Sequence, residues 1–288
     1  MPQPAVIDSL QNTTVLDPVT RAATSVIDRV VRSPGVKDLL HGVWLGHPLH
    51  PVLVQVPVGA WTSAAVLDAL PGTGTAPDQL IAVGLLGLVP AVATGWTDWS
   101  ALHEQQQRVG VVHAASNVLA GGLYLSSLVA RRRGHRERGR ILGWAGYSVA
   151  GLGSYLGGHL AYRQAAGTNH AEFVPHLVKP GWHDIAAMDD LPEGRPTTRR
   201  LGDVNLMVLR RGDRADVLAN RCSHLDGPLA GGKIHVEGGE ECVTCPWHGS
   251  TFRLRDGAVV HGPTTSPQPV FRTQVTEGRL KVLLEGAG

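Results

Sequence analysis

Two short segments of this chain each place one cysteine close to one histidine. The first, "RCSHLDGPLAGG", contains Cys222 and His224, and the second, "CPWHGSTF", contains Cys245 and His248. Gly and Pro flank the pair in both segments, and twenty residues separate His224 from Cys245. Thiolate sulfur and imidazole nitrogen are metal ligands, so the pattern predicts a metal centre.

Two kinds of centre fit this spacing. Two thiolates and two imidazoles bind zinc tetrahedrally, or they bind a 2Fe–2S cluster with both Cys on one iron and both His on the other. The spacing alone does not decide between them. A disulfide framework is excluded because the chain has only three cysteines, and the third, Cys242, lies outside both segments.

The elements that position these segments are predicted to be short strands. Residues 181–288 are rich in charged side chains and contain brief apolar runs separated by turn signals such as Asp256-Gly257 and Glu277-Gly278. This pattern predicts an all-β barrel or sandwich of antiparallel strands, with both Cys/His segments on its loops. The runs are Leu206–Leu209, Asp216–Ala219, Phe252–Leu254, Ala258–Val260, Val270–Thr276 and Leu280–Leu284.

The first half of the chain has a different composition, dominated by Ala, Gly, Leu and Val. Four stretches lack Asp, Glu, Lys and Arg in their interiors and are about long enough to cross the hydrocarbon layer as helices. They predict a four-helix transmembrane bundle over residues 46–168. The stretches are Pro51–Leu67, Gln79–Thr97, Val109–Ala130 and Ile141–Tyr162.

Two further segments complete the organisation. Residues 1–45 show the spacing of amphipathic helices that lie on the membrane surface or on the bundle. Residues 169–180, rich in Pro, Gly and His, are expected to link the bundle to the β domain of residues 181–288. The net charge of +2 gives no argument for a nucleic-acid partner.

Histidines in the membrane part are candidates for a second cofactor. With four spans, His50, His113 and His159 fall at the same side of the bundle, and ionisable groups within membranes are functional candidates. Two imidazoles from different helices suit a haem b, and the same side chains suit a quinone. The alternative is a structural role, with hydrogen bonds to water or backbone.

The flanking residues of the Cys/His segments favour the iron–sulfur cluster. "CSHLDGPL" and "CPWHGSTF" closely resemble the two cluster-binding boxes of Rieske proteins, and "DGAVVHGPTTSPQP" resembles their third loop, which here includes Pro263. The resemblance runs from about residue 175 onward.

That resemblance implies roles for individual residues. Cys222 and Cys245 would hold the buried iron, and His224 and His248 would hold the outer iron. Gly249 would let the loop close over the cluster, and the Ser250 hydroxyl would donate a hydrogen bond to a cluster sulfur.

The boxes depart from those of Rieske subunits in cytochrome bc-type complexes, which carry an additional Cys in each box. Asp226 or a neighbour and Trp247 stand at those places, and Phe252 stands where many bc-type proteins have Tyr. The segments are therefore more similar to Rieske ferredoxins, with a potential toward the lower part of the range of roughly −150 to +300 mV.

The membrane half resembles a bacterial membrane family of uncharacterised function. The resemblance rests on the turn "GHPLHP", Gly46–Pro51, and on "GGHLAYRQAAG", Gly157–Gly167, and it covers roughly residues 40–168. It implies a topology but no reaction.

Together these features predict a membrane-anchored one-electron carrier. The expected partners are membrane lipid, a redox protein (reductase, cytochrome or oxygenase) and a quinone or haem. The alternative is a redox sensor in which the cluster acts on the bundle. Only forty residues follow His248, too few for the catalytic domain of an oxygenase, so a complete substrate-transforming enzyme is not expected.

The expected location is the cell membrane, with several spans. Arginines crowd the loop 131–140, but Lys and Arg also flank the spans on the other face. The positive-inside rule therefore does not assign a side to the β domain.

Overall fold

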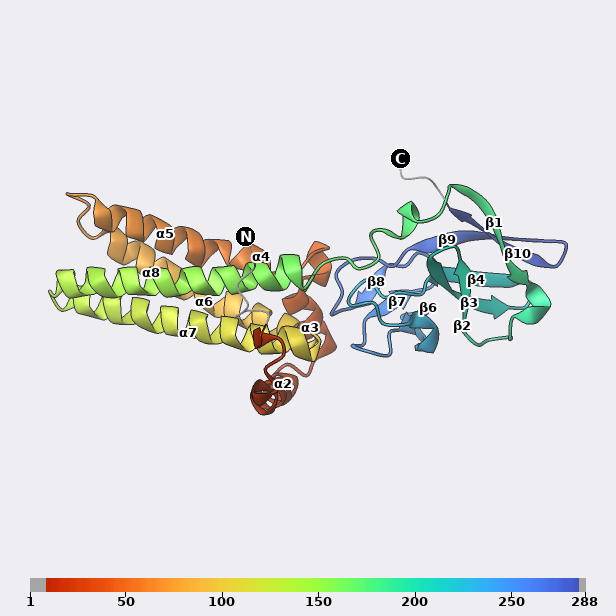
Figure 1. Ribbon diagram of the computed structural model, residues 1–288, viewed down its shortest axis with the longest axis horizontal. Helices are drawn as coiled ribbons and strands as arrows, with labels where there is room; N and C mark the ends of the chain where they lie inside the picture. Colours follow the sequence, from red (N-terminus) through yellow and green to blue (C-terminus); the bar gives the residue numbers. More distant parts are fainter. Residues whose placement is uncertain (1–8, 285–288) are drawn as a thin grey trace. The chain divides into compact units, whose positions relative to one another are not determined.

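A computed structural model describes residues 9–284 of the chain (Figure 1). Residues 1–8 and 285–288, at the ends of the first and last predicted domains, lie outside the described part. The chain divides into a helical unit, Met1–Val36 with Pro48–Ala166, and a β unit, Lys37–His47 with Gly167–Gly288.

The helical unit consists of four long helices preceded by shorter ones. Its core is small and includes a stack of Trp61 on Tyr124, with ring centroids 4.2 Å apart, beside the buried Ile81. The α-helices are α2 (Asp17–Val30), α4 (His50–Leu53), α5 (Gln55–Ala69), α6 (Ala76–Ser100), α7 (Glu104–Arg132) and α8 (Arg136–Gly158), and a π-helical turn, His159–Arg163, follows. Helix α3 (Pro34–His41) bridges the two units in sequence.

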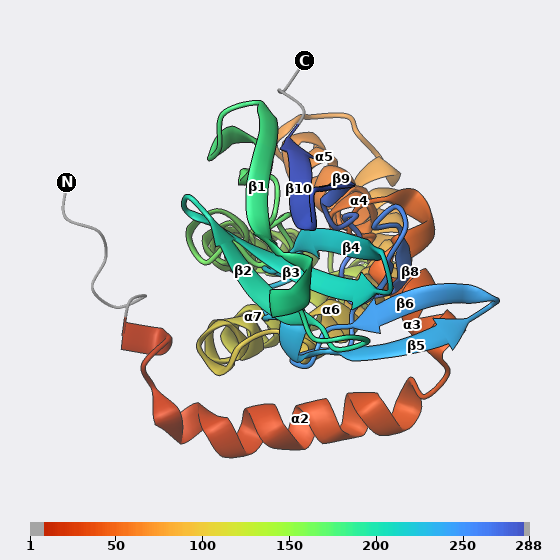
Figure 2. The same ribbon diagram turned by 90° about the vertical axis from the view of Figure 1, so that its right-hand side faces the viewer.

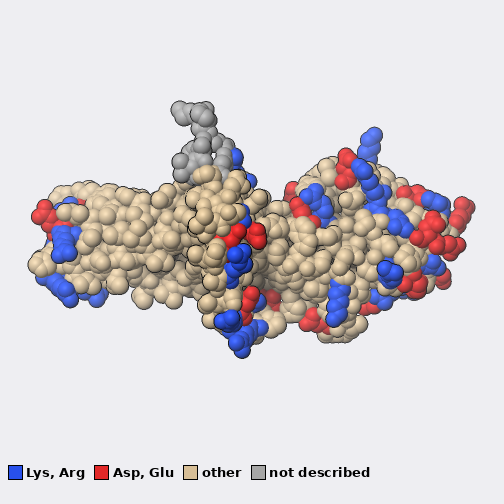
Figure 3. Space-filling model, turned by 60° about the horizontal axis from the view of Figure 1, so that its bottom comes forward, with Lys and Arg blue, Asp and Glu red and all other residues tan. Residues whose placement is uncertain are grey.

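Three helical segments are long and apolar enough to cross a membrane: His50–Ala69, Ala76–Ser100 and Glu104–Arg132. At most a third of each most apolar window is buried inside the protein, so most of these side chains face outward. Figure 3 shows a face of this unit with little charge along the helices and clusters of charge at one end. Helix α8 is not among the three. It starts with charged residues and is rich in Gly, which lowers its hydropathy, so the fourth span stays a prediction.

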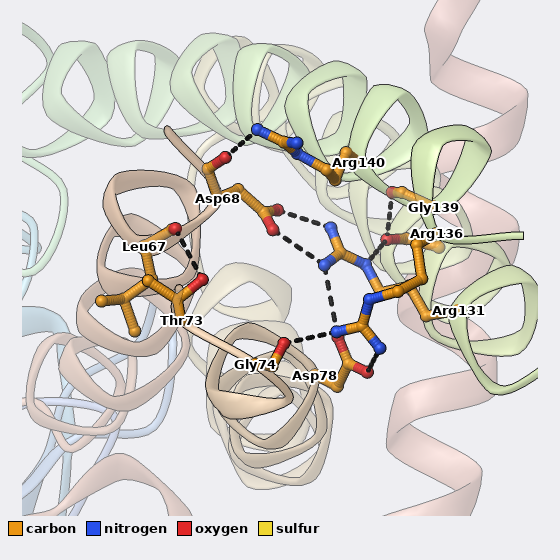
Figure 4. Close-up of polar contacts among 10 residues, drawn as sticks. Leu67, Asp68, Thr73, Gly74, Asp78, Arg131, Arg136, Gly139 and Arg140 are labelled. Carbon is orange, nitrogen blue, oxygen red and sulfur yellow. Dashed lines mark hydrogen bonds and ion pairs between the residues drawn. The ribbon is translucent and has the colours of Figure 1, made fainter. Parts of the chain in front are cut away.

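A buried ion-pair network connects the α5–α6 hairpin to the α7–α8 hairpin, near the loops that join the helices of each pair (Figure 4). The Arg131 guanidinium donates to both carboxylate oxygens of Asp68, at 2.8 and 2.5 Å, and to Asp78 at 3.2 Å. Arg136 also pairs with Asp78, and Arg140 donates to the carbonyl of Asp68. The side chains of Arg131 and Asp68 are almost completely buried. The network therefore joins the end of α5, the start of α6, the end of α7 and the start of α8.

Helix α2 runs crosswise to the long helices, end-on in Figure 1 and side-on in Figure 2. Its first residue, Asp17, forms an ion pair with Arg108 of α7 through two hydrogen bonds, of 2.6 and 3.1 Å. Val19, Val26 and Val30 remain exposed on its surface. The predicted amphipathic helix is thus present, attached to the bundle by a charged contact.

The β unit is all-β and antiparallel, as predicted from its turn-separated runs. Its two sheets have the strand orders β1-β10-β9-β4-β3-β2 and β5-β6-β7-β8. The strands are β1 (Gly181–Ala187), β2 (Thr197–Leu201), β3 (Val204–Arg211), β4 (Arg214–Ala219), β5 (Lys233–Glu237), β6 (Glu240–Thr244), β7 (Thr251–Arg253), β8 (Val259–His261), β9 (Val270–Thr276) and β10 (Arg279–Leu284). Strands β1, β2, β5 and β6 were not among the predicted runs, because they lack a continuous apolar stretch.

Two segments outside the strands also pack in the β unit. The expected linker, residues 169–180, contributes Ala171 and Val174 to the core of the larger sheet. Residues Lys37–His47, within the predicted surface-helix region, group with the β unit. Asp38 accepts hydrogen bonds there from His261 at 2.7 Å and from the backbone N–H of Gly262 at 2.9 Å.

Candidate metal centre

Two loops of the β unit have the same backbone hydrogen-bond pattern. The first box, Cys222–Gly227, follows β4, and the second box, Cys245–Ser250, joins β6 to β7. In each box the Cys N–H donates to the carbonyl five residues later, at 2.9 and 2.8 Å, and the Cys carbonyl accepts from the N–H four residues later, at 3.0 and 3.2 Å. Asp226 and Gly249 occupy that fourth position with φ of 63° and 83°. Gly and Asp tolerate this left-handed conformation, which explains part of the similarity between the two segments.

The four predicted ligands form two pairs, with both sulfurs in the core and one of the two imidazoles partly exposed. Cys222 and Cys245 belong to the hydrophobic core under the smaller sheet, with exposed fractions of 1 and 4%. The imidazoles of His224 and His248 meet edge to face, with ring centroids 5.1 Å apart. His224 is buried and His248 is partly exposed beside Trp247, which is 51% exposed.

A third loop, residues 262–269 between β8 and β9, is hydrogen-bonded to both boxes. The Gln268 side chain accepts from the N–H of Ser223 at 3.0 Å and donates to the carbonyls of Ala219 and Arg221. The hydroxyls of Ser223 and Thr264 lie 2.9 Å apart. Ser223, Thr264 and Gln268 are all buried. Sequence reasoning did not single out these three residues, because an isolated Ser, Thr or Gln carries no spacing signal.

Comparison with known proteins identifies this unit. A family model described as "Rieske [2Fe-2S] domain" matches residues 181–272. The anthranilate 1,2-dioxygenase ferredoxin subunit of Burkholderia cepacia is 34% identical over 101 residues, covering 35% of this chain and 90% of that protein. The C-terminal part of this chain belongs to the Rieske family. The cofactor of the domain is therefore a Rieske-type 2Fe–2S cluster, and the domain is homologous to electron-transfer ferredoxins of dioxygenases.

Solved structures similar to the Rieske domain include two from other bacteria. The ferredoxin of carbazole 1,9a-dioxygenase from Nocardioides aromaticivorans IC177 is 30% identical, covering 36% of this chain and 98% of its own, with a TM-score of 0.33. A putative NADH-dependent nitrite reductase small subunit from Mycobacterium tuberculosis is 25% identical, covering 38% and 100%, with a TM-score of 0.35.

The helical unit has a family of its own. A model described as "Predicted membrane protein (DUF2231)" matches residues 46–170. The chain is thus a fusion of a predicted membrane domain with a Rieske domain, as the two resemblances implied.

The side chains of the Rieske domain fit the cluster. Each iron of a 2Fe–2S cluster takes two protein ligands, because bridging sulfides supply the rest. The boxes offer two such pairs, and no group of three or more His, Cys, Asp or Glu suited to a metal ion occurs in the described part of the chain. Gly227 has no room for a side chain, since a Cβ there would lie 2.6 Å from the Cys245 sulfur.

The two thiols share a hydrogen bond that separates their proton affinities. This bond and burial raise the pKa of Cys222, and the same bond lowers the pKa of Cys245 to about 7. One sulfur of the pair is thus ready to lose its proton near neutrality, as a thiolate ligand must. Cys242 is also buried, with a pKa raised by burial, and lies in β6, outside both boxes.

The remaining predicted residues lie around the boxes. The Ser250 hydroxyl is hydrogen-bonded to the Cys222 sulfur and accepts from the N–H of Thr264 at 3.2 Å. Pro263 opens the third loop after a cis peptide bond with Gly262. Ser250 is therefore in contact with both the first box and the third loop.

The three predicted histidines of the helical unit are not alike. His50 begins α4 and His113 lies in α7, and each imidazole is hydrogen-bonded to a backbone carbonyl of a neighbouring helix. His159 opens the π-helical turn after α8, and its Nε2 atom is buried.

Proposed function

We propose that this protein is a membrane-anchored one-electron carrier whose 2Fe–2S cluster is held by Cys222 and Cys245 on the inner iron and by His224 and His248 on the outer iron. The observation that carries the proposal is the pair of matching boxes. They direct two sulfurs into the core and bring two imidazoles together, of which His248 is partly exposed.

This arrangement suits electron transfer rather than substrate chemistry. The cluster, when bound, accepts and returns a single electron. The thiolates of Cys222 and Cys245 would balance the charge of the inner iron, and the neutral imidazoles of His224 and His248 would leave the outer iron easier to reduce. The half-exposed Trp247 and the partly exposed His248 form the surface at which a partner approaches.

The partner we propose is a redox protein. The ferredoxin subunit of anthranilate 1,2-dioxygenase, similar over 90% of its length, is by its name a component of a dioxygenase. A reductase as electron donor and an oxygenase or cytochrome as acceptor are therefore the partner classes we propose.

The helical unit is proposed to anchor the carrier as a multi-pass protein of the cell membrane. Three apolar helices with outward-facing side chains support this, together with the match to a predicted membrane family. Helix α2 runs crosswise to these helices and exposes three valines, so we propose that it lies along the membrane surface.

The test uses the full chain purified in detergent. We expect iron and acid-labile sulfide in equal amounts, a Rieske-type EPR signal after reduction, and rapid, reversible reduction by a ferredoxin reductase. Cys242→Ser, a buried cysteine outside the boxes, should keep all three properties. Reversible reduction with no protein partner, combined with oxidant-driven cluster loss, would favour the sensor instead. Colourless, zinc-containing protein would refute both functions.

A further inference from the structure

His50 and His113 are held in the same way by two different helices. His50 Nδ1 lies 2.8 Å from the carbonyl oxygen of Ala91 in α6, and His113 Nδ1 lies 2.7 Å from that of Gly153 in α8. Four residues beyond each carbonyl is a glycine packed against the imidazole. A Cβ at Gly95 would lie 2.7 Å from Cε1 of His50, and a Cβ at Gly157 would lie 3.1 Å from Cε1 of His113.

We call each combination of carbonyl and glycine a histidine seat. The first seat is Ala91 with Gly95, and the second is Gly153 with Gly157. A glycine in the interior of a helix lowers its stability by roughly 1 kcal/mol relative to alanine. The contact between each glycine and the imidazole packed on it offsets this loss in both seats. The same arrangement occurs twice within one unit, on side chains 63 positions apart in the chain.

The seats fix the tautomer of both rings. A carbonyl oxygen only accepts hydrogen bonds, so Nδ1 must carry the proton. A neutral imidazole has one N–H, and its Nε2 therefore presents a lone pair. Histidines that bind metals have this arrangement, with the other ring nitrogen donating to a carboxylate or a backbone carbonyl.

Asn117 lies beside the His113 ring. Its amide nitrogen is 3.5 Å from Nδ1 and 3.2 Å from Nε2, a position over the ring face and away from the in-plane lone pair of Nε2. The same amide donates to the His113 carbonyl at 3.0 Å, so Asn117 keeps a partner when Nε2 binds a metal. A quinone oxygen would instead need an N–H donor, which Nε2 in this tautomer lacks.

Two imidazoles alone hold a bare metal ion poorly, and the described residues offer no group of three or more His, Cys, Asp or Glu for one. A haem needs only two axial ligands, because the porphyrin supplies four nitrogens. His50 lies against α6, which packs on α7, the helix that bears His113, and both side chains are partly exposed. We infer that His50 and His113 are the axial ligands of a b-type haem in the helical unit.

The test measures haem in the full chain purified in detergent from cells supplied with a haem precursor. We expect stoichiometric protohaem by the pyridine haemochromogen assay and the optical and EPR spectra of a low-spin, six-coordinate, bis-imidazole iron. His50→Ala and His113→Ala should each lower the haem content at least about tenfold, since even supporting residues change metal affinity by about 10–100-fold. His135→Ala, at an exposed histidine in the α7–α8 loop, is the matched control and should keep the haem.

Glycine variants test the seats without removing a ligand. Gly95→Ala and Gly157→Ala push a methyl group against the imidazole, so both should lower haem content or convert the spectrum to high spin. Gly151→Ala, in the same helix as Gly157, places its Cβ in open space and should behave as the natural chain. These variants remain informative if a His→Ala variant fails to accumulate.

Circular dichroism of the helices reports the folded helical unit in every sample, and the EPR signal of the Rieske cluster separates the two proposals. Cluster without haem in the natural chain would overturn this inference and leave the electron carrier standing. Haem without cluster would do the reverse. Haem retained at full content in His50→Ala or His113→Ala, or co-purified quinone with no haem, would also overturn it.

Discussion

The Rieske domain and the helical unit each bring two imidazoles together, but by different means. His224 and His248 lie in loops whose turns are closed by hydrogen bonds within five residues of each cysteine. His50 and His113 lie on helices, and each ring is fixed by the backbone of another helix. The boxes are therefore encoded locally in the sequence, whereas the seats exist only after the helices have packed.

The difference extends to how each unit is stabilised. Three buried polar side chains of the Rieske domain join its loops through neutral hydrogen bonds. The helical unit joins its loops through a buried ion-pair network around Arg131 (Figure 4), and the long helices carry little surface charge along their length (Figure 3). The proposed membrane location of the helical unit fits this difference, because an exposed charge is costly along a membrane span but not in water.

The largest predicted effect is the loss of the cluster when one ligand is removed from the Rieske domain and the helical unit is left unchanged. His224→Ala or Cys245→Ala should abolish the cluster, because an iron left with one protein ligand loses more than the 10–100-fold in affinity that supporting residues contribute. Iron, sulfide and the EPR signal of the purified chain measure this. Helix content and membrane insertion should be unchanged. A cluster that survives either substitution would contradict the assignment of the boxes.

The sequence indicated the two boxes because their determinants are local. Cys, His, Gly and Pro recur at fixed spacing in two segments of the sequence. The later strands of the β domain overlap the apolar runs from which they were predicted. The fastening residues Ser223, Thr264 and Gln268 were missed, because their function depends on contacts across about 40 positions. Strands β5 and β6 were missed because charged residues, such as the consecutive Glu240 and Glu241, leave them without a continuous apolar run.

In the helical unit, composition predicted helices but not their contacts. The spacing Gly153-x-x-x-Gly157 predicts close helix approach, yet nothing local indicates that His113 packs there. The Asp68–Arg131 pair was likewise invisible, since the two residues are 63 positions apart. Segment Lys37–His47 was assigned to the surface helices by its periodicity, whereas Asp38 contacts the β unit.

The second prediction concerns the ion-pair network. Arg131→Met leaves Asp68 buried without its main partner, which should destabilise the helical unit by about 3–5 kcal/mol. Denaturant titration in detergent, followed by the fluorescence of the helical tryptophans, measures the loss. Arg138→Met, at an exposed arginine in the first turn of α8, should cost less than about 0.5 kcal/mol. If Arg131→Met destabilises the Rieske domain, followed by its cluster signal, as much as it destabilises the helical unit, the two units do not unfold separately. That result would contradict the difference described between them.

The third prediction concerns the potential of the cluster. Ser250→Ala removes the hydroxyl that donates to the Cys222 sulfur, a bond that strengthens as the cluster gains an electron. A loss of roughly 1 kcal/mol lowers a one-electron potential by roughly 40 mV. Redox titration followed by EPR measures the shift. Thr251→Val is the control, because the neighbouring Thr251 hydroxyl bonds to Gly249 and Thr244 and should leave the potential unchanged.

The smallest predicted effect is a pH dependence confined to the β unit. Burial lowers the pKa of His261, but hydrogen bonds to Asp38 and Glu237 outweigh it, so the pKa lies above its ordinary 6.5. Folding then favours protonated His261. The added stability is fully present below pH 6.5 and is lost as the pH rises through the higher folded pKa. The bonds to His261 and His235 in turn lower the pKa of Glu237, so its contribution is lost only in acid, below the ordinary pKa of 4.5.

His261→Gln should therefore lower the melting temperature of the cluster signal at pH 6 and have little effect at pH 9. The difference should stay below about 1 kcal/mol, because the pair is partly exposed. Asp38→Asn should reproduce it, since Asp38 lies in segment Lys37–His47, and His183→Gln, which loses only a bond to a carbonyl, should not. An Asp38→Asn variant with the natural pH profile would mean that this segment does not stabilise the Rieske domain. The boundary between the two units would then lie after His47.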